Sequence, residues 1–304
     1  MSAAALEERD CGRHVRVLFG ERSGKYPSGN TLQVSGREES VLIDPSLGLH
    51  ARRAAGEALP AADRLLLSHC HEDHLAGVSL YPRTPCHVPR LEQGALASLD
   101  ALMELYGYPE PIGSGWRKAL VEQFHFLPRP DALGYDDGER FELGGVSIRA
   151  IHAPGHTVGH SLFHVEPDDV LYLGDIDLSS FGPYYGDAWS SLEDFERTLT
   201  IARGIAARWY ATFHHIGVIE GREAFVARLD RYAAVIADRE RRLLAYLAEP
   251  RSLDEIAARR FVYRPQDPVP FADPVERRSM GQHLDRLVRS GRIRRVDPGR
   301  FRIV

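Results

Sequence analysis

Four side chains suited to metal binding lie within six residues of one another, at His69, His71, Asp73 and His74. They follow an apolar segment, residues 64–67, that predicts a short buried strand. At the end of a strand His69 and His71 point to the same side, because they are two residues apart, and both can bind one metal ion. If the chain then turns into a helix, Asp73 and His74 face the same pocket from another direction, where they suit a second ion.

Ordinary packing explains this segment poorly. Buried polar side chains cost free energy unless they are paired, so three histidines and an aspartate are an expensive way to fill a core. The pattern therefore favours a metal centre.

Further polar residues follow other apolar segments, at Asp44, His156, Asp175 and either His214 or His215. Because each follows a predicted strand, we expect them to meet at one common edge of the sheets. Histidine and carboxylate ligands suit zinc, although iron or manganese could use the same donors, and a carboxylate can bridge two ions. Two divalent metal ions are thus the expected cofactors, and ions about 3.5–4 Å apart could activate a water molecule for attack on an acyl or phosphoryl centre.

Length, net charge and cysteine content limit the kinds of protein that this chain can be. The 304 residues suffice for one large domain and a smaller one, and the net charge of −5 gives no general affinity for nucleic acid or an anionic membrane. The three cysteines, Cys11, Cys70 and Cys86, argue against a disulfide framework and for a reducing compartment. The first ten residues lack the apolar core of a signal peptide, and no apolar segment is long enough to span a membrane. We expect a soluble cytoplasmic protein without membrane partners.

Short apolar segments that predict strands position these clusters. In the first half of the chain they cover residues 14–19, 31–34, 41–43, 65–67 and 85–88. In the second half they cover residues 139–143, 146–152, 160–165, 170–173 and 209–212. Helices are expected at residues 50–59 and 191–205, the second capped by Ser190 or Ser191.

Residues 90–126 look like an insertion into this alternating order. Apolar residues at helical spacing predict one helix over 90–106, and Ser114 can cap another that runs to about residue 124. The insertion is rich in large side chains: Met103, Tyr106, Tyr108, Trp116, Phe124 and Phe126. Ordinary helix packing is the favoured interpretation, and a cap that lines a substrate pocket is the alternative.

The character of the chain changes near residue 221. One long helix is expected over 221–248, and Ser252 with Glu255 forms a capping-box pattern. A helix at about 275–290 and strands at 291–296 and 300–304 follow. This order is typical of a winged-helix unit, so we expect domains at 1–220 and 221–304.

The ordered motifs resemble those of the metallo-β-lactamase-fold hydrolases. They are His-x-His-x-Asp-His at 69–74, Gly155-His156-Thr157, Gly174-Asp175 and His214, and the resemblance covers residues 14–220. It implies an α/β fold, a four-layer αβ/βα sandwich with a dinuclear metal site at the sheet edges.

The resemblance also implies a role for each site residue. One metal would be bound by His69, His71 and His156. The other would be bound by Asp73, His74 and His214. Asp175 would bridge the two metals, and Asp44 would support the ligand loop through hydrogen bonds. Asp73 is in addition the expected catalytic residue, which orients the attacking hydroxide.

Three neighbouring residues need separate interpretations. His214 is preferred over His215 because it is the first polar residue beyond the strand, but both stay open. His160 is expected to be a buried, hydrogen-bonded histidine rather than a ligand. Cys70 lies between two ligands and should point away from the metals into the core.

The substrate is less well indicated than the metal site. The Gly-His-Thr-Val-Gly-His segment at 155–160 resembles glyoxalase II and related thioesterases, although the glutathione-binding residues of glyoxalase II have no match here. We therefore expect hydrolysis of a small-molecule thioester or ester. A β-lactamase role is not expected, because such enzymes are usually exported and the chain shows no signal segment.

The C-terminal order resembles another branch of the fold, which includes small-molecule hydrolases and a single-strand ribonuclease. The alternative is thus a metal-dependent ribonuclease or phosphodiesterase that uses basic residues of the winged unit: Arg292, Arg294, Arg295, Arg300 and Arg302. Nucleic acid is not favoured as a partner, because a solvated surface beside acidic residues is the preferred explanation of these arginines. A regulatory role through the winged unit is a third hypothesis, and a homodimer stays open.

Overall fold

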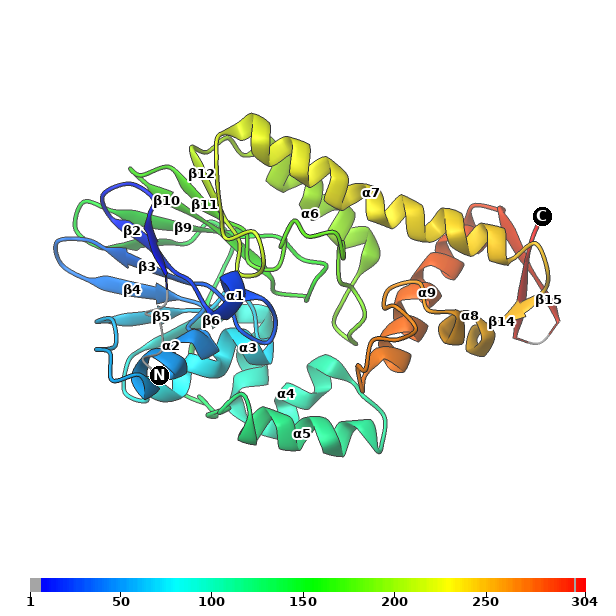
Figure 1. Cartoon of the computed structure of the whole chain (residues 1–304), viewed down its shortest axis with the longest axis horizontal. Coiled ribbons are helices and arrows are strands. Elements are labelled where there is room, and N and C mark those ends of the chain that lie inside the picture. Colours follow the sequence, from blue (N-terminus) through cyan, green and yellow to red (C-terminus); the bar gives the residue numbers. More distant parts are fainter. Residues whose placement is uncertain (1–6, 298) are drawn as a thin grey trace.

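Two β-sheets lie face to face at the centre of the protein, and helices cover the outer face of each (Figure 1). The computed structural model describes residues 7–297 and 299–304. Helix, sheet, sheet and helix follow one another as layers, so the predicted four-layer αβ/βα sandwich is confirmed.

The first sheet has seven strands and comes from the first half of the chain. In spatial order they are β1 (Glu8–Asp10), β2 (Val15–Leu18), β3 (Thr31–Ser35), β4 (Ser40–Ile43), β5 (Arg64–Leu66), β6 (Cys86–Pro89) and β7 (Leu133–Tyr135). The strands from β1 to β4 pair antiparallel, and those from β4 to β7 pair parallel.

The second sheet has six strands. In spatial order they are β13 (Val218–Glu220), β12 (Trp209–Ala211), β11 (Val170–Tyr172), β10 (Ser161–Glu166), β9 (Ser147–His152) and β8 (Arg140–Glu142). Only β11 and β12 are parallel, because α6 connects them.

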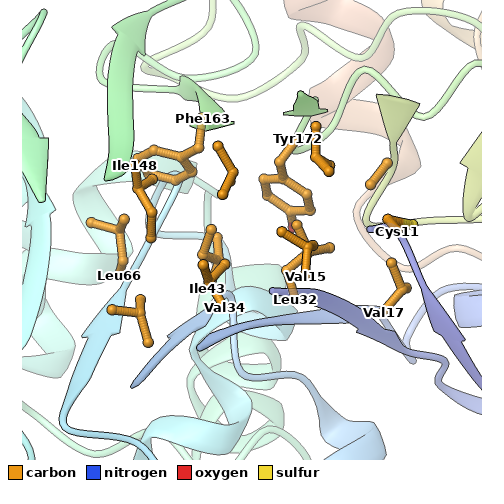
Figure 2. Close-up of a cluster of buried hydrophobic side chains, with 14 of the residues drawn as sticks. Cys11, Val15, Val17, Leu32, Val34, Ile43, Leu66, Ile148, Phe163 and Tyr172 are labelled. Carbon is orange, nitrogen blue, oxygen red and sulfur yellow. The ribbon is translucent and has the colours of Figure 1, made fainter. Parts of the chain in front are cut away.

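The core between the sheets forms from alternate residues of the strands. Figure 2 shows Ile148, Phe163 and Tyr172 of the second sheet pointing toward Leu32 and Val34 of the first. All five side chains are fully buried. This packing holds the two sheets in register and fixes the edge at which their polar residues meet.

Helices complete the outer layers. The first sheet is covered by α2 (Leu47–Ala54), α4 (Leu99–Tyr106) and α5 (Ile112–Glu122), and the second by α6 (Leu192–Gly204) and α7 (Arg222–Tyr246). The shorter helices are α1 (Glu21–Gly24), α3 (Glu72–Leu75) and the 3-10 helices η1 (Ala76–Leu80) and η2 (Arg90–Ala97). The predicted cap of α6 is confirmed, since the Ser191 side chain accepts a hydrogen bond from the amide of Asp194.

Three helix predictions were wrong in their bounds. The helix that Ser114 was expected to cap is α5, which begins at Ile112 after Pro111, so Ser114 lies inside it. The helix expected at 50–59 is α2, which begins earlier because Ser46 caps it. The single helix expected over 90–106 is η2 followed by α4. It breaks at Ser98, which is extended (φ −158°, ψ 164°) and accepts a hydrogen bond from the amide of Ala101, so its hydroxyl begins a new helix.

Three edge strands of the two large sheets were not predicted, and neither was the two-residue strand β14 (Arg251–Ser252) of the small sheet. The three edge strands are β1, β7 and β13, each three residues long at the end of a sheet. All three residues of β1, Glu-Arg-Asp, are exposed, so the strand carries no apolar pattern to identify it.

The C-terminal region adds two helices and a small sheet. Its elements are β14 (Arg251–Ser252), α8 (Leu253–Arg259), α9 (Ala272–Arg289), β15 (Ile293–Asp297) and β16 (Arg300–Ile303), and the sheet order is β14-β16-β15. The capping box of Ser252 and Glu255 is confirmed. The helix, helix and hairpin occur in the expected order, but the winged-helix assignment stays a prediction.

The long helix α7 contributes to two cores. Its Leu229 and Tyr232 pack with the second sheet, whereas Leu243 and Leu247, at and beyond its end, pack with the C-terminal helices. The domain boundary at 220/221 therefore stays a prediction, since one helix passes through both regions (Figure 1).

Hydrogen bonds join the C-terminal region to the sandwich. Arg278 of α9 donates to the carbonyl oxygens of Tyr106 and Gly107 at the end of α4. The Tyr185 hydroxyl lies 2.9 Å from Nε2 of His283 in α9. The C-terminal region is thereby held close to the insertion and to the loop after β11.

Cys11, Cys70 and Cys86 are buried and free. None of the helices in the described ranges is both long and apolar enough to cross a membrane.

Arg239 of α7 is expected to contribute strongly to stability. Its side chain is 1% exposed and donates to the carbonyl oxygens of Pro183 (2.5 Å) and Phe181 (2.8 Å). We expect Arg239→Met to lower the free energy of unfolding by about 3 kcal/mol, because it leaves two carbonyl oxygens without a donor. Urea denaturation checks this.

Arg241→Met is the matched control. Arg241 lies two residues along the same helix, with a side chain 72% exposed, and bonds only to Asp238. Its substitution should change stability by less than about 0.5 kcal/mol. Equal effects of the two substitutions would contradict a special role for Arg239.

Candidate metal centre

The polar residues predicted from the sequence meet at one edge of the two sheets. Asp44 follows β4, the segment 67–75 follows β5, and His156 lies between β9 and β10. Asp175 follows β11 and His214 follows β12. Seven side chains form two adjacent groups of donors, one of His69, His71, His156 and Asp175, the other of Asp73, His74 and His214.

The first group contains three ring nitrogens that converge. Nδ1 of His71 lies 3.1 Å from Nε2 of His69 and 2.8 Å from Nε2 of His156. Nitrogens that share a tetrahedral zinc ion at about 2.0–2.1 Å are roughly 3.3 Å apart. The spacing therefore fits three histidines around one ion.

The second group lies on the other side of Asp175. Nε2 of His214 is 2.9 Å from Oδ2 of Asp73 and 3.8 Å from Oδ1 of Asp175, and Nε2 of His74 is 3.0 Å from the same Oδ1. The other oxygen of Asp175, Oδ2, lies 3.1 Å from Nε2 of His156 in the first group. Asp175 thus faces each group with one oxygen, as a bridging ligand must.

The outward nitrogens of the histidines have partners that orient the rings. Nδ1 of His156 lies 3.0 Å from the carbonyl oxygen of Tyr184, and Nδ1 of His214 lies 2.8 Å from that of Gly24. A carbonyl oxygen only accepts, so each Nδ1 carries a proton and Nε2 faces the centre. Such outer partners are typical of metal-binding histidines.

The outward nitrogens of His74 and His71 face carboxylate oxygens instead of carbonyl oxygens. Nδ1 of His74 lies 2.8 Å from Oδ2 of Asp44, and Nε2 of His71 lies 3.0 Å from Oδ2 of Asp187. His71 is therefore turned the opposite way, with Nδ1 toward the centre.

Asp44 supports the ligand loop as predicted. Its carboxylate is fully buried and accepts hydrogen bonds from the amide and hydroxyl of Ser68 (2.7 and 2.5 Å) and from the hydroxyl of Tyr172 (2.7 Å). With the contact to His74, one side chain links both sheets to the loop that carries four of the seven donors.

The charges of the centre favour a cation. Burial lowers the pKa of His74, but Asp175 and Asp44 outweigh burial and raise this pKa well above its usual value. For His214 the same competition, with Asp175 and Asp73, raises the pKa to about 9. Oδ2 of Asp73 is buried and accepts no well-aligned hydrogen bond. Buried carboxylates that hold positive charge on their neighbours, with one oxygen to spare, fit the donor set of a metal site.

His214 and His215 have different environments. His214 is buried among the donors, whereas His215 has a side chain 34% exposed and lies 3.7 Å from Asp177. The geometry favours His214 as the seventh donor.

His160 and Cys70 lie as predicted. His160 is buried, with Nδ1 2.9 Å from the carbonyl oxygen of Ala153, and its Nε2 accepts from the amide of Asp175 (3.1 Å). Burial lowers the pKa of His160 to about 3, so it is neutral and can accept this bond. Cys70 packs in the core against the first sheet.

Two functional contacts were missed from the sequence. Glu92 of η2 is fully buried and accepts from the amides of Cys70 and Gly159 (2.7 Å each), so it joins the two histidine-bearing loops. Asp187 contacts His71. Neither lies in a motif, and Glu92 occupied a segment expected to pack as a helix. A glutamate in an apolar stretch was the only available signal.

A cleft of about 1230 Å³ has five of the seven donors in its wall: His71, Asp73, His156, Asp175 and His214. Aromatic side chains form much of its lining: Tyr26, Tyr106, Tyr108, Trp116, Phe181, Tyr184, Tyr232, Phe261, Tyr263 and Phe271. The pocket-lining interpretation of the insertion is thus confirmed for Tyr106, Tyr108 and Trp116. Met103 and Phe124 are buried in the core, as the packing interpretation expects. A cap that moves stays a prediction.

A family model and several solved structures match this chain. The family model described as the metallo-β-lactamase superfamily matches residues 27–237. Among solved structures, a metallo-β-lactamase family protein from Thermus thermophilus superposes with a TM-score of 0.69 at 25% identity, over 96% of this chain and 99% of that one. A β-lactamase domain protein from Burkholderia ambifaria gives a TM-score of 0.68 at 19% identity, over 99% and 94% of the two chains, and shows the fold alone.

Proteins similar in sequence to this chain include named thioesterases. The chain is 29% identical over 175 residues to the human acyl-coenzyme A thioesterase MBLAC2, which covers 50% of this chain and 60% of the relative. It is 29% identical over 174 residues to the atrochrysone carboxyl ACP thioesterase of Aspergillus chevalieri, or 55% of this chain and 46% of the relative. The chain thus spans about half the length of these relatives.

The adjacent histidines allow a matched test of the donor set. We expect His214→Ala to lower the affinity for one metal equivalent at least about tenfold, because it removes a donor. His215→Ala should retain the metal content of the unchanged protein. Mass spectrometry of metals after dialysis against a weak chelator measures both. Metal loss in His215→Ala alone would reverse the assignment.

Proposed function

The chain belongs to the metallo-β-lactamase superfamily and is a hydrolase, and on this premise we propose that it cleaves small-molecule thioesters at a dinuclear metal site. The observation that carries the proposal is the pair of donor groups on either side of Asp175, open to an aromatic cleft. Hydrolysis forms a bond between the carbonyl carbon and the oxygen of water, breaks the bond from carbon to sulfur, and releases a thiolate that takes up a proton.

The proposed ligand sets follow the two groups. His69, His71 and His156 would hold one ion. Asp73, His74 and His214 would hold the other. Asp175 would lie between the two. Bound divalent ions supply Lewis acidity and a water nucleophile of low pKa. Zinc suits this histidine-rich set, and iron or manganese could use the same donors.

The chain's own residues orient the reactants. Asp73 is the proposed catalytic residue. Burial raises its pKa, but His214 and His74 outweigh burial and hold the pKa below its usual value, so the carboxylate stays ionised. The ionised carboxylate can accept a hydrogen bond from the attacking water. Asp44, Glu92 and Asp187 act as positioning residues, because they hold donors or the loops that carry donors.

The thioester preference rests on the cleft and on the relatives. The aromatic lining suits an apolar acyl group, and the named relatives act on acyl-coenzyme A or on an acyl carrier protein. Three buried free cysteines support a reducing, cytoplasmic setting. The arginines that suggested a ribonuclease are not in the described lining of the cleft. Arg292 pairs with Glu240 and Arg300 with Glu255.

A substrate panel tests this proposal. Purified protein with measured metal content is assayed with an acyl-coenzyme A, an oxygen ester, a phosphodiester and a β-lactam. We expect kcat/KM for the thioester to exceed that for the phosphodiester and the lactam by at least about a hundredfold, since a site shaped for one reaction discriminates strongly. A metal-dependent preference for the phosphodiester would contradict the proposal.

Asp73→Ala is the variant for the same panel. Its kcat should fall at least about a hundredfold, because it removes both a metal donor and the acceptor for water. Arg294→Ala, an exposed wing residue outside the cleft, is its control and should leave kcat unchanged. Full turnover by Asp73→Ala with its metal retained would exclude the proposed role.

A further inference from the structure

The cleft extends beyond the metal centre to the segment that joins α8 and α9. Residues 259–265 of this segment lie in the lining, together with residues from α7. This far part is rich in arginine, with Arg242 from α7, Arg259 from the end of α8, and Arg260 and Arg264 from the segment. Arg231 lines the cleft farther back along α7. Such a concentration is notable in a chain whose net charge is −5.

The acidic residues nearby do not balance these arginines. Asp238 pairs with Arg242 at 2.9 Å, and also with Arg241 outside the cleft. Asp267 is 4.0 Å from Arg264. Within the described ranges, no ion pair is formed by Arg231, Arg259 or Arg260. None of these three guanidinium groups is taken up by a carboxylate of the described residues, and two of them, Arg259 and Arg260, are adjacent in the chain and are available to a ligand.

Arg260 is the least satisfied of the three. Its Nη1 is buried and has no hydrogen-bond partner. Its backbone adopts φ 61°, ψ 106° at the end of α8, a conformation that side-chain-bearing residues rarely adopt. A buried guanidinium nitrogen without an acceptor is costly. Among the arginines of the described cleft lining, Arg260 alone carries such a nitrogen, so a ligand in the cleft that offers an acceptor would relieve this cost.

An aromatic path joins this cluster to the metal centre. Ring contacts run from His71 to Tyr106 (5.5 Å), from Tyr106 to Tyr108 (5.4 Å), from Tyr108 to Phe271 (5.5 Å) and from Phe271 to Tyr263 (6.3 Å). The path therefore begins at a metal donor and ends three residues from Arg260. It suits a long, uncharged ligand with its reactive group at one end and its anion at the other.

We propose that Arg260, with Arg259, binds the phosphate of the thiol carrier, so that the substrate is an acyl thioester of a phosphorylated pantetheine. The acyl end then lies at the metal centre and the pantetheine arm along the aromatic path. Guanidinium groups suit this role because they bind phosphate through paired, charge-assisted hydrogen bonds. The inference rests on the proposed thioester function and adds where the carrier binds.

Binding of uncleavable thioethers by the metal-loaded full chain tests the inference. By calorimetry, unchanged protein should bind S-methyl-coenzyme A at least about tenfold more tightly than S-methyl-pantetheine, which lacks phosphate. Arg260→Gln should weaken binding of S-methyl-coenzyme A about tenfold and leave that of S-methyl-pantetheine unchanged, as expected for one lost charge-assisted contact. Equal binding of the two thioethers by unchanged protein would overturn the inference.

The controls separate a binding role from a structural one. Arg294→Gln, on the exposed wing, should bind both thioethers as unchanged protein does. Arg260→Lys should restore part of the affinity for S-methyl-coenzyme A only. If Arg260→Gln weakens binding of both thioethers equally, Arg260 shapes the cleft and the phosphate role is excluded.

A third thioether identifies the source of the phosphate. If S-methyl-4′-phosphopantetheine binds as tightly as S-methyl-coenzyme A, the phosphate shared with carrier proteins is recognised. If only S-methyl-coenzyme A binds tightly, the nucleotide phosphates are recognised. Both results support the inference. Loss of affinity for a single-stranded oligonucleotide in Arg260→Gln, with no preference among the thioethers, would overturn it in favour of nucleic acid.

The outcome for the anion site can be distinguished from the outcome for the reaction. Hydrolysis of acyl-coenzyme A and acyl-pantetheine with the same KM, unchanged in Arg260→Gln, would keep the proposed function and overturn the carrier site. Absence of thioester hydrolysis, with phosphate-dependent thioether binding that Arg260→Gln abolishes, would overturn the reaction and support the site.

Discussion

The carboxylate of Asp44 is the interaction on which the rest of the centre depends. It lies at the end of β4, has no exposure to solvent, and accepts hydrogen bonds from Ser68 and from Tyr172 of the opposite sheet while it contacts His74. A buried carboxylate is stable only when its oxygens are fully paired. The sheets, the ligand loop and one histidine can therefore satisfy Asp44 in only one arrangement, and that arrangement gathers the donors.

Other buried polar groups around the centre must also be paired, and their hydrogen bonds hold further parts of the site. Glu92 ties the two histidine-bearing loops together, and the carbonyl of Tyr184 holds His156. Arg239 in turn anchors the loop that carries Tyr184, through the carbonyl oxygens of Phe181 and Pro183. A helix shared with the C-terminal region thus helps to orient a donor of the metal centre, so the two regions of the chain act on one site.

Local patterns explain how much could be predicted from the sequence. The spacing of His69, His71, Asp73 and His74 predicted a shared centre, and the polar residues after β11 and β12 predicted where it would be completed. His214 could be preferred over His215 only weakly, because their separation depends on how the chain turns after β12. Ser98 shows a second limit of prediction from local patterns. The apolar spacing around it predicted one continuous helix, but Ser98 ends η2 and begins α4.

The residues that escaped prediction all act through contacts distant in sequence. Glu92 is 67 positions from Gly159, and Asp187 reaches His71 from the loop between β11 and α6. The proposed role of Arg260 depends on an aromatic path to the metal centre, which α4 and the segment before α9 build together. Sequence patterns report which face of an element is buried, but not which elements meet there.

The central claim is that seven side chains form two metal sites joined by Asp175. Anomalous X-ray diffraction from crystals of the metal-loaded protein, measured at the absorption edge of the bound metal, tests it most directly. The account predicts two peaks per chain, one among His69, His71 and His156 and the other among Asp73, His74 and His214, with the carboxylate of Asp175 between them. A single peak, or a peak beside His215, would contradict it.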